Sequence, residues 1–133
     1  MSQTVRTITI EGAAMTDIAA FYREINRVMM DGESRQIGDS LDALSDLLYG
    51  GFGAISGQEK VRLVWRDIGV AQAALGIEAT LAYYRAKLTR PGVYNIDTAQ
   101  RAIDALEQGK GQTYFDIVLE IIGEHGNIEL VKA

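Results

Sequence analysis

The stretch Gly38-Asp39-Ser40-Leu41-Asp42-Ala43-Leu44-Ser45-Asp46-Leu47-Leu48-Tyr49-Gly50-Gly51-Phe52 predicts a short amphipathic helix, and the rest of the chain can be arranged around it. Asp39 or Ser40 can cap its first turn, because a short polar side chain there accepts a hydrogen bond from a free backbone N–H group. Leucines then recur at the spacing of one buried helix face: Leu41, Leu44 and Leu48. Gly50-Gly51 follows and can end the helix.

Two carboxylates lie on the opposite face of this predicted helix. Asp42 and Asp46 are four residues apart with no basic residue between them, a like-charge pair that destabilises an isolated helix by roughly 0.2–0.5 kcal/mol. The helix dipole stabilises Asp42 but does little for Asp46. From Asp31 to Asp46 the only basic residue is Arg35, so negative charge gathers where the preceding loop meets the helix. The two aspartates either keep a surface helix soluble or bind a cationic partner.

The same segment resembles the signature of the barstar family, the intracellular protein inhibitors of bacterial extracellular ribonucleases. The resemblance is carried by Ile37-Gly38-Asp39-Ser40-Leu41-Asp42-Ala43-Leu44-Ser45-Asp46-Leu47-Leu48, which is similar to the family's aromatic-Gly-acid-Asn-Leu-Asp-Ala-Leu-Trp-Asp pattern. Leu63-Val64-Trp65-Arg66-Asp67 is similar to the family's second strand, which ends in a Trp-Arg pair. In that family the two aspartates enter the ribonuclease active site. The resemblance therefore implies a partner-binding surface made of Asp42, Asp46, Ser45, Ile37, Gly38, Asp39 and Gly50.

Five residues depart from the family pattern. Gln36-Ile37 stands where the family has an aromatic pair, and Ser45 stands where it has a tryptophan between the two aspartates. Ser40 replaces an asparagine, and His125 falls where the family carries an acid late in the last helix. The missing aromatic residues keep a second hypothesis open, an interaction module on the same fold whose partner is not a nuclease.

Alternating or apolar runs predict three strands, at residues 5–10, 60–65 and 128–131. Apolar residues at steps of three and four predict a helix from Ile18 to Met29, with Thr16 as its cap. A last helix is predicted to begin at Thr113, with Asp116 completing a capping box, and to end at Gly126. Strands separated by helices should be parallel. We expect an α/β fold covered by helices, and the resemblance implies a three-stranded parallel sheet in the order 1-2-3.

A helical insertion is predicted at about 70–110, between strand 2 and the last helix, because the resemblance covers roughly 1–70 and 111–133. Helices are expected over 68–75, from 77 to about 90, and from Asn95 or Asp97 to about 108. The apolar stripe of the second of these, which includes Leu81 and Tyr84, is expected to pack on the last helix. Since 133 residues with a hydrophobic share of 47% can build one core, we expect a single domain over 1–133.

Composition excludes several classes of function. A net charge of −5 argues against nucleic-acid binding, and no apolar run is long enough to cross a bilayer. The chain has no cysteine and no recognisable leader, so we expect a cytoplasmic protein that is a monomer when free.

The sequence offers little for catalysis. His125 is the only histidine and has no activated serine near it, so we expect it to interact with the free carbonyls at the end of the last helix. Asp42 and Asp46 are too few ligands for a dedicated divalent metal site, which makes a metal-assisted hydrolase the weakest hypothesis. We therefore predict no cofactor, no metal and no catalytic residue. The leading hypothesis is a protein inhibitor or immunity protein that blocks a basic ribonuclease.

Overall fold

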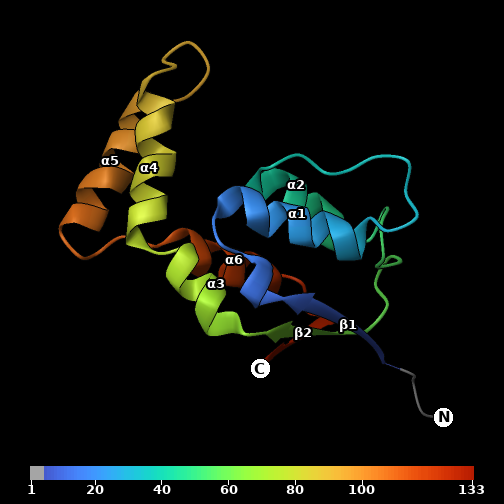
Figure 1. The fold of residues 1–133 in the computed structure, drawn as a ribbon. Coiled ribbons are helices and arrows are strands. Elements are labelled where there is room, and N and C mark those ends of the chain that lie inside the picture. The colour runs from blue at the N-terminus through green and yellow to red at the C-terminus, as the bar shows by residue number, and fades with distance from the viewer. Residues whose placement is uncertain (1–4) are drawn as a thin grey trace.

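The computed structural model describes residues 5–133, which form an α/β fold (Figure 1). Strands β1 (Arg6–Glu11), β2 (Val61–Arg66) and β3 (Ile128–Lys132) pair in parallel, in the order β1-β2-β3. This confirms the predicted sheet and its order. The first four residues of the predicted domain lie outside the described residues.

The helices lie where the apolar spacing predicts them. They are α1 (Ile18–Met29), α2 (Leu41–Leu48), α3 (Ile68–Ala74), α4 (Ile77–Leu88), α5 (Ile96–Glu107) and α6 (Tyr114–Gly123), with a short 3-10 turn, η1 (Gly12–Ala14), after β1.

Local hydrogen bonding decides where these helices begin and end. Asp17, not Thr16, caps α1, because the Asp17 carboxylate accepts a hydrogen bond from the Ala20 N–H at 2.7 Å. Asn95 caps α5 in the same way, and the predicted capping box of α6 is complete. The last helix ends at Gly123 rather than at Gly126.

One face of the sheet carries the core and the other faces solvent. Burial alternates along β1 and β2, and the buried residues are Ile8, Ile10, Val61, Leu63 and Trp65. On the outer face, Arg62 pairs with Glu129 at 3.1 Å and Arg66 pairs with Glu11 at 3.3 Å. The helices therefore cover this parallel sheet on one side only.

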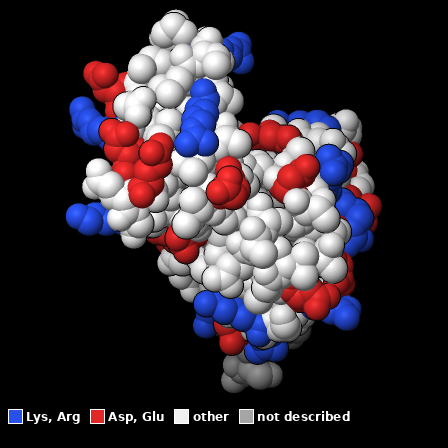
Figure 2. Space-filling model, turned by 60° about the vertical axis from the view of Figure 1, so that its left-hand side comes forward, with Lys and Arg blue, Asp and Glu red and all other residues white. Residues whose placement is uncertain are grey.

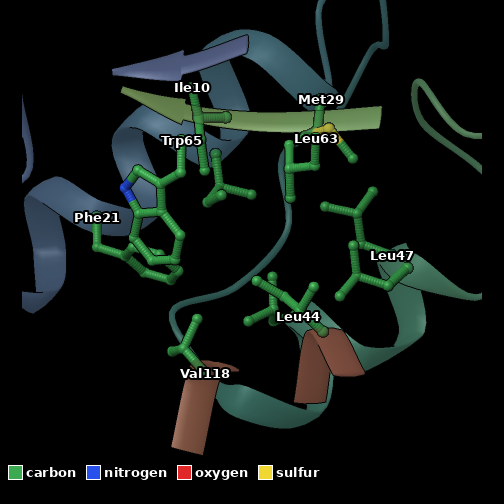
Figure 3. A pocket seen from close by; sticks show the side chains of 11 residues that line it. Ile10, Phe21, Met29, Leu44, Leu47, Leu63, Trp65 and Val118 are labelled. Atoms are coloured by element: carbon green, nitrogen blue, oxygen red, sulfur yellow. The ribbon is translucent and has the colours of Figure 1, made fainter. Parts of the chain in front are cut away.

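The core lies between the covered face of the sheet and helices α1, α2 and α6 (Figure 3). Trp65 is fully buried, and its ring lies 6.0 Å from that of Phe21 and 5.6 Å from that of Phe115. Side chains from five elements surround a void of about 10 Å³, and those labelled in Figure 3 are Ile10, Phe21, Met29, Leu44, Leu47, Leu63, Trp65 and Val118. A void of this size with an apolar lining stays dry.

Helices α4 and α5 lie side by side and stand away from the sheet (Figure 1). Together with the turn between them we call them the hairpin, residues 77–107. A second, separate cluster fills the space between them: Leu81, Ile103 and Leu106, with Tyr84 and Leu88 packed against it. The prediction that this stripe packs on the last helix is therefore wrong. The apolar side of α5, which follows after a short turn, covers it instead.

Only the base of the hairpin contacts α6. The Thr80 hydroxyl accepts a hydrogen bond from the Tyr114 N–H at 2.7 Å, and the ring of Tyr83 meets that of Tyr114 edge-on at 5.1 Å. The hydroxyl of Tyr114 is in turn hydrogen-bonded to the hydroxyl of Tyr22 on α1. Burial raises the pKa of both Tyr22 and Tyr114 far above its ordinary value, so both hydroxyls stay protonated at neutral pH.

These two clusters should respond differently to truncation. Leu44→Ala removes a side chain that is 2% exposed in the main core and should lower the free energy of unfolding by about 2–5 kcal/mol. Ile103→Ala removes one that is 3% exposed in the hairpin, so exchange of the α4 and α5 amides should accelerate while the β2 amides keep their protection. Hydrogen exchange measures both. Equal loss of protection in β2 in the Ile103→Ala variant would show that the hairpin and the main core open as one unit.

A buried carboxylate ties α1 to the end of β1. Glu24 is 4% exposed, and its oxygens accept hydrogen bonds from Nε and Nη2 of Arg27, each at 2.7 Å, and from the Glu11 N–H at 2.8 Å. The hydrogen bonds from Arg27 lower the pKa of Glu24, outweighing the effect of burial. Glu24 therefore stays charged in the folded protein below the pH at which an ordinary glutamate takes up a proton.

This shift makes stability depend on pH. Because the folded pKa is the lower one, Glu24 stabilises the fold above the ordinary pKa of about 4.3, and this contribution is lost as the pH falls through the folded value. Glu24→Gln should therefore lower the urea midpoint at about pH 7, and the difference from the unaltered protein should shrink towards about pH 3. Glu78→Gln, at an exposed position in the first turn of α4, is the control and should behave like the unaltered protein. A difference that is the same at every pH would contradict this assignment.

Candidate functional site

Helix α2 is fixed at both ends by its own sequence. The Ser40 hydroxyl accepts a hydrogen bond from the Ala43 N–H at 3.1 Å, so Ser40 rather than Asp39 is the cap. At the other end Gly50 is buried and has a φ of 85°, and a Cβ there would lie 2.4 Å from the carbonyl oxygen of Gly57. Gly50, predicted as a partner contact, thus turns the chain beneath the surface.

Asn26 on α1 holds the loop that leads into α2. Its Oδ1 accepts a hydrogen bond from the Ile37 N–H at 2.8 Å, and its Nδ2 donates to the Ile37 carbonyl at 3.3 Å and to the Tyr22 carbonyl at 3.0 Å. Asn26 is 6% exposed, so these bonds form away from water. The sequence analysis missed this residue, because nothing in the helical spacing of α1 marks an asparagine as the anchor of a distant loop.

The acidic side chains of α2 and of the preceding loop point outward. Of the seven residues predicted for this surface, the exposed ones are Gly38, Asp39, Asp42 and Asp46; Ile37 and Ser45 are half-buried and Gly50 is buried. No ion pair within residues 5–133 involves Asp39, Asp42 or Asp46. The structure thus holds three carboxylates at one end and one face of a short helix, none of them in an ion pair within the described chain.

Tyr49 belongs to the same exposed face and was not predicted. It lies three residues after Asp46 and seven after Asp42, and it is 60% exposed. Its ring packs edge-on against that of His125, with centroids 4.6 Å apart. The available signal was its spacing, since an aromatic residue one turn after Asp46 extends the acidic face.

His125 has a different role from the one predicted. It is 6% exposed, and its Nε2 has no hydrogen-bond partner among the residues that the structure describes. The carbonyls at the end of α6 instead accept hydrogen bonds from backbone N–H groups. One of these is the His125 N–H, which donates to the Ile122 carbonyl at 3.1 Å. The imidazole therefore supports Tyr49 by packing.

A hollow of about 340 Å³ separates the beginning of α2 from the hairpin. Asp39 and Asp42 line one wall, and Tyr83, Lys87 and Tyr94 line the other. Figure 2 shows the side on which the hairpin meets the body: the surface is notched between them, and acidic side chains gather around the notch. Sequence reasoning did not find this hollow, because its two walls lie about forty residues apart in the chain.

Residues 5–89 match the family model described as Barstar (barnase inhibitor), which is more than half of the chain. The chain belongs to the barstar family. This confirms the family inferred from the sequence, although the matched residues do not coincide with the predicted extent of roughly 1–70 and 111–133. The matched part of this barstar-family chain runs from β1 through α4, and α5, α6 and β3 lie beyond it. A search of curated proteins found no match.

The family description names an inhibitor of an enzyme and not a catalyst. Within residues 5–133 there is no group of three or more His, Cys, Asp or Glu side chains that could hold a metal ion. None of the helices in the described part of this barstar-family chain is long and apolar enough to span a bilayer.

The role of Asn26 can be tested directly. Asn26→Ala leaves the N–H and carbonyl of Ile37 without their partner, which should lower the free energy of unfolding by about 1–3 kcal/mol and shift the amide signals of the loop and of α2. Asn127→Ala is a control of the same chemistry, because it removes a 2.9 Å bond from Nδ2 to the Glu59 carbonyl and no bond to the loop that leads into α2. NMR spectra and urea titrations measure both effects. If the α2 signals do not move in Asn26→Ala, this residue does not position the helix.

Proposed function

We propose that this protein inhibits a bacterial extracellular ribonuclease by covering its active site with α2. The observation that carries the proposal is that Asp42 and Asp46 are exposed on a rigidly held helix, without a counter-ion, in a chain of the barstar family. The chain itself performs no catalysis in this proposal and requires no cofactor.

The chemistry of the target explains why carboxylates suit this role. A ribonuclease active site binds phosphate with arginine, lysine and histidine side chains. A carboxylate on a rigid helix can take the place of that phosphate and form charge-assisted hydrogen bonds with the same groups. Because the helix is already formed, little ordering is required when the complex forms.

Charge around α2 should also speed the encounter. The loop and helix from Asp31 to Asp46 carry five acidic residues, and the one basic residue among them, Arg35, lies over the ring of Phe52 with 4.6 Å between its Cζ and the ring centroid. An acidic surface of this kind attracts a basic protein, and the effect weakens as salt is added. Peripheral acids should therefore govern the association rate and the central pair the dissociation rate.

Tyr49 provides an exposed aromatic residue on α2, at a different position from the tryptophan of the family pattern. Ser45 stands at the position of the family's tryptophan, whereas Tyr49 is exposed on the same face of α2 and its ring is supported by His125. Tyrosine is among the residues most often dominant in protein interfaces. We infer that Tyr49 contacts the rim of the ribonuclease active site.

The biological setting belongs to the same proposal. The protein acts in the cytoplasm as an immunity protein, is a monomer when free, and protects the cell that makes the ribonuclease. A second candidate, an interaction module with a partner that is not a nuclease, is favoured by Ser45 and Ile37, which are half-buried and lack the family's aromatic rings at those positions.

The proposal is tested by inhibition of RNA cleavage. The enzymes are barnase and any small basic secreted ribonuclease encoded beside this chain's gene. We expect inhibition of at least one of them, weakening as salt is added. Inhibition of none would favour the second candidate.

The central variant is Asp46→Ala. It should weaken binding to the inhibited ribonuclease by on the order of 2–5 kcal/mol, because cations buried in the interface lose their partner. It should leave the thermal midpoint unchanged or slightly raised, since it relieves a like-charge repulsion of roughly 0.2–0.5 kcal/mol. Asp104→Ala makes the same charge change on an exposed position of α5 and should bind almost as tightly as the unaltered protein. Unchanged binding by Asp46→Ala would show that α2 is not the inhibitory element.

A further inference from the structure

The hollow between α2 and the hairpin has the composition of a site for one basic side chain. We propose that it receives an arginine of the partner, at a position that flanks the active site covered by α2. This inference rests on the proposed function, because it assigns a second contact of the same partner. It gives the hairpin a share in the binding surface.

The hollow is large enough for such a side chain. Its volume is about 340 Å³, many times the roughly 10–15 Å³ that one water molecule needs. Asp42, which lines it, lies one helical turn before Asp46. A partner seated on α2 therefore has a side-chain path into it.

The charged residues that line the hollow determine whether it binds a cation or an anion. Asp39 and Asp42 on the α2 wall form no ion pair with any described residue, whereas Lys87 is the only base among the residues that line the hollow. Two acids against one base leave the hollow negative. The carboxylates also occupy the wall that the partner reaches from α2.

The opposite wall already holds a cation. The Lys87 Nζ lies 4.4 Å from the ring centroid of Tyr83, 5.2 Å from that of Tyr94 and 5.7 Å from that of Tyr84. Aromatic faces attract cations, and arginine can stack on a tyrosine while its N–H groups pair with a carboxylate. A guanidinium between Asp42 and Tyr94 would satisfy both walls at once.

The test uses a small probe, so that it does not depend on the identity of the ribonuclease. N-acetyl-L-arginine amide is titrated into the folded protein, and amide NMR signals are followed. We expect shifts at residues 39–42 and at Lys87 and Tyr94. N-acetyl-L-citrulline amide has nearly the same shape without the charge and should cause much smaller shifts at these positions. Equal shifts with both probes, or shifts confined to other surfaces, would overturn the proposal.

Variants of the two walls sharpen the test. Asp42→Asn should weaken binding of the arginine probe roughly two- to five-fold, the range expected for one exposed charge pair. Lys87→Met keeps the length of the stem but removes the competing charge, so it should strengthen binding of the probe. Weaker binding by Lys87→Met would show that the hollow takes an anion or a neutral group and would overturn the proposal.

The tip of the hairpin offers a matched pair of neighbours. Tyr94 lines the hollow, whereas Val93 beside it is 61% exposed and does not. Tyr94→Ala should weaken both the arginine probe and the inhibited ribonuclease, and Val93→Ala should change neither. If Asp46→Ala loses inhibition while Tyr94→Ala and Val93→Ala are alike, the hollow is unused and the proposed function stands. If the probe binds the hollow and no ribonuclease is inhibited, the proposed function fails and the cation site remains.

Discussion

Burial of one face of α2 is the constraint on which the rest of the structure depends. Leu44 and Leu47 are 2% and 0% exposed, and they line the same void as Leu63 and Trp65 of the sheet (Figure 3). Each fully buried leucine contributes about 1.5–3 kcal/mol, whereas repulsion between Asp42 and Asp46 costs only roughly 0.2–0.5 kcal/mol. Burial therefore wins by a wide margin, and the helix can carry unpaired carboxylates on its other face.

Because leucine burial outweighs the repulsion between the aspartates, one helix can serve both the fold and the proposed function. A surface that must bind cations elsewhere is most useful when its carboxylates are unneutralised and immobile before the encounter. The Ser40 cap, the turn at Gly50 and the Asn26 anchor each limit the motion of α2 without touching its acidic side chains. One face of the helix stabilises the fold, and the other is the face that we propose binds the partner, so the two can change independently.

The elements of the fold were predictable from the sequence because each is set by a local period. The alternation in β1 and β2 and the leucine spacing in α2 both survive in the structure. The missed features need information about distant residues. Leu47 was left out of the core because it falls between the counted leucines, although it is 0% exposed and lines the core void with residues of α1 and β2. The prediction of how the hairpin packs was wrong because the sequence has two apolar stripes, on α5 and α6, and either could have covered α4.

Some residues of the candidate site could likewise be predicted from the sequence, and others could not. Asp42 and Asp46 could be found because their spacing is local and the family pattern contains them. Asn26 could not be found, because it holds α2 from a distant part of the chain. The same is true of Tyr94, which faces α2 across the hollow. The contact of His125 with Tyr49 could not be predicted either, because no helical spacing connects the two residues.

The tyrosine contacts at the base of the hairpin have a mechanical consequence. Tyr22, Tyr114 and Tyr83 form a continuous column from α1 through α6 to α4, joined by one pair of hydroxyls and by two edge-on ring contacts. This column connects the base of the hairpin to the main core, so the hairpin would pivot about it. A swing of α4 and α5 that widens the gap towards α2 must tilt Tyr83 against Tyr114, and Tyr114 is held at 0% exposure in the main core. In the proposed complex, the width of the hollow would therefore depend on how these tyrosines pack inside the protein.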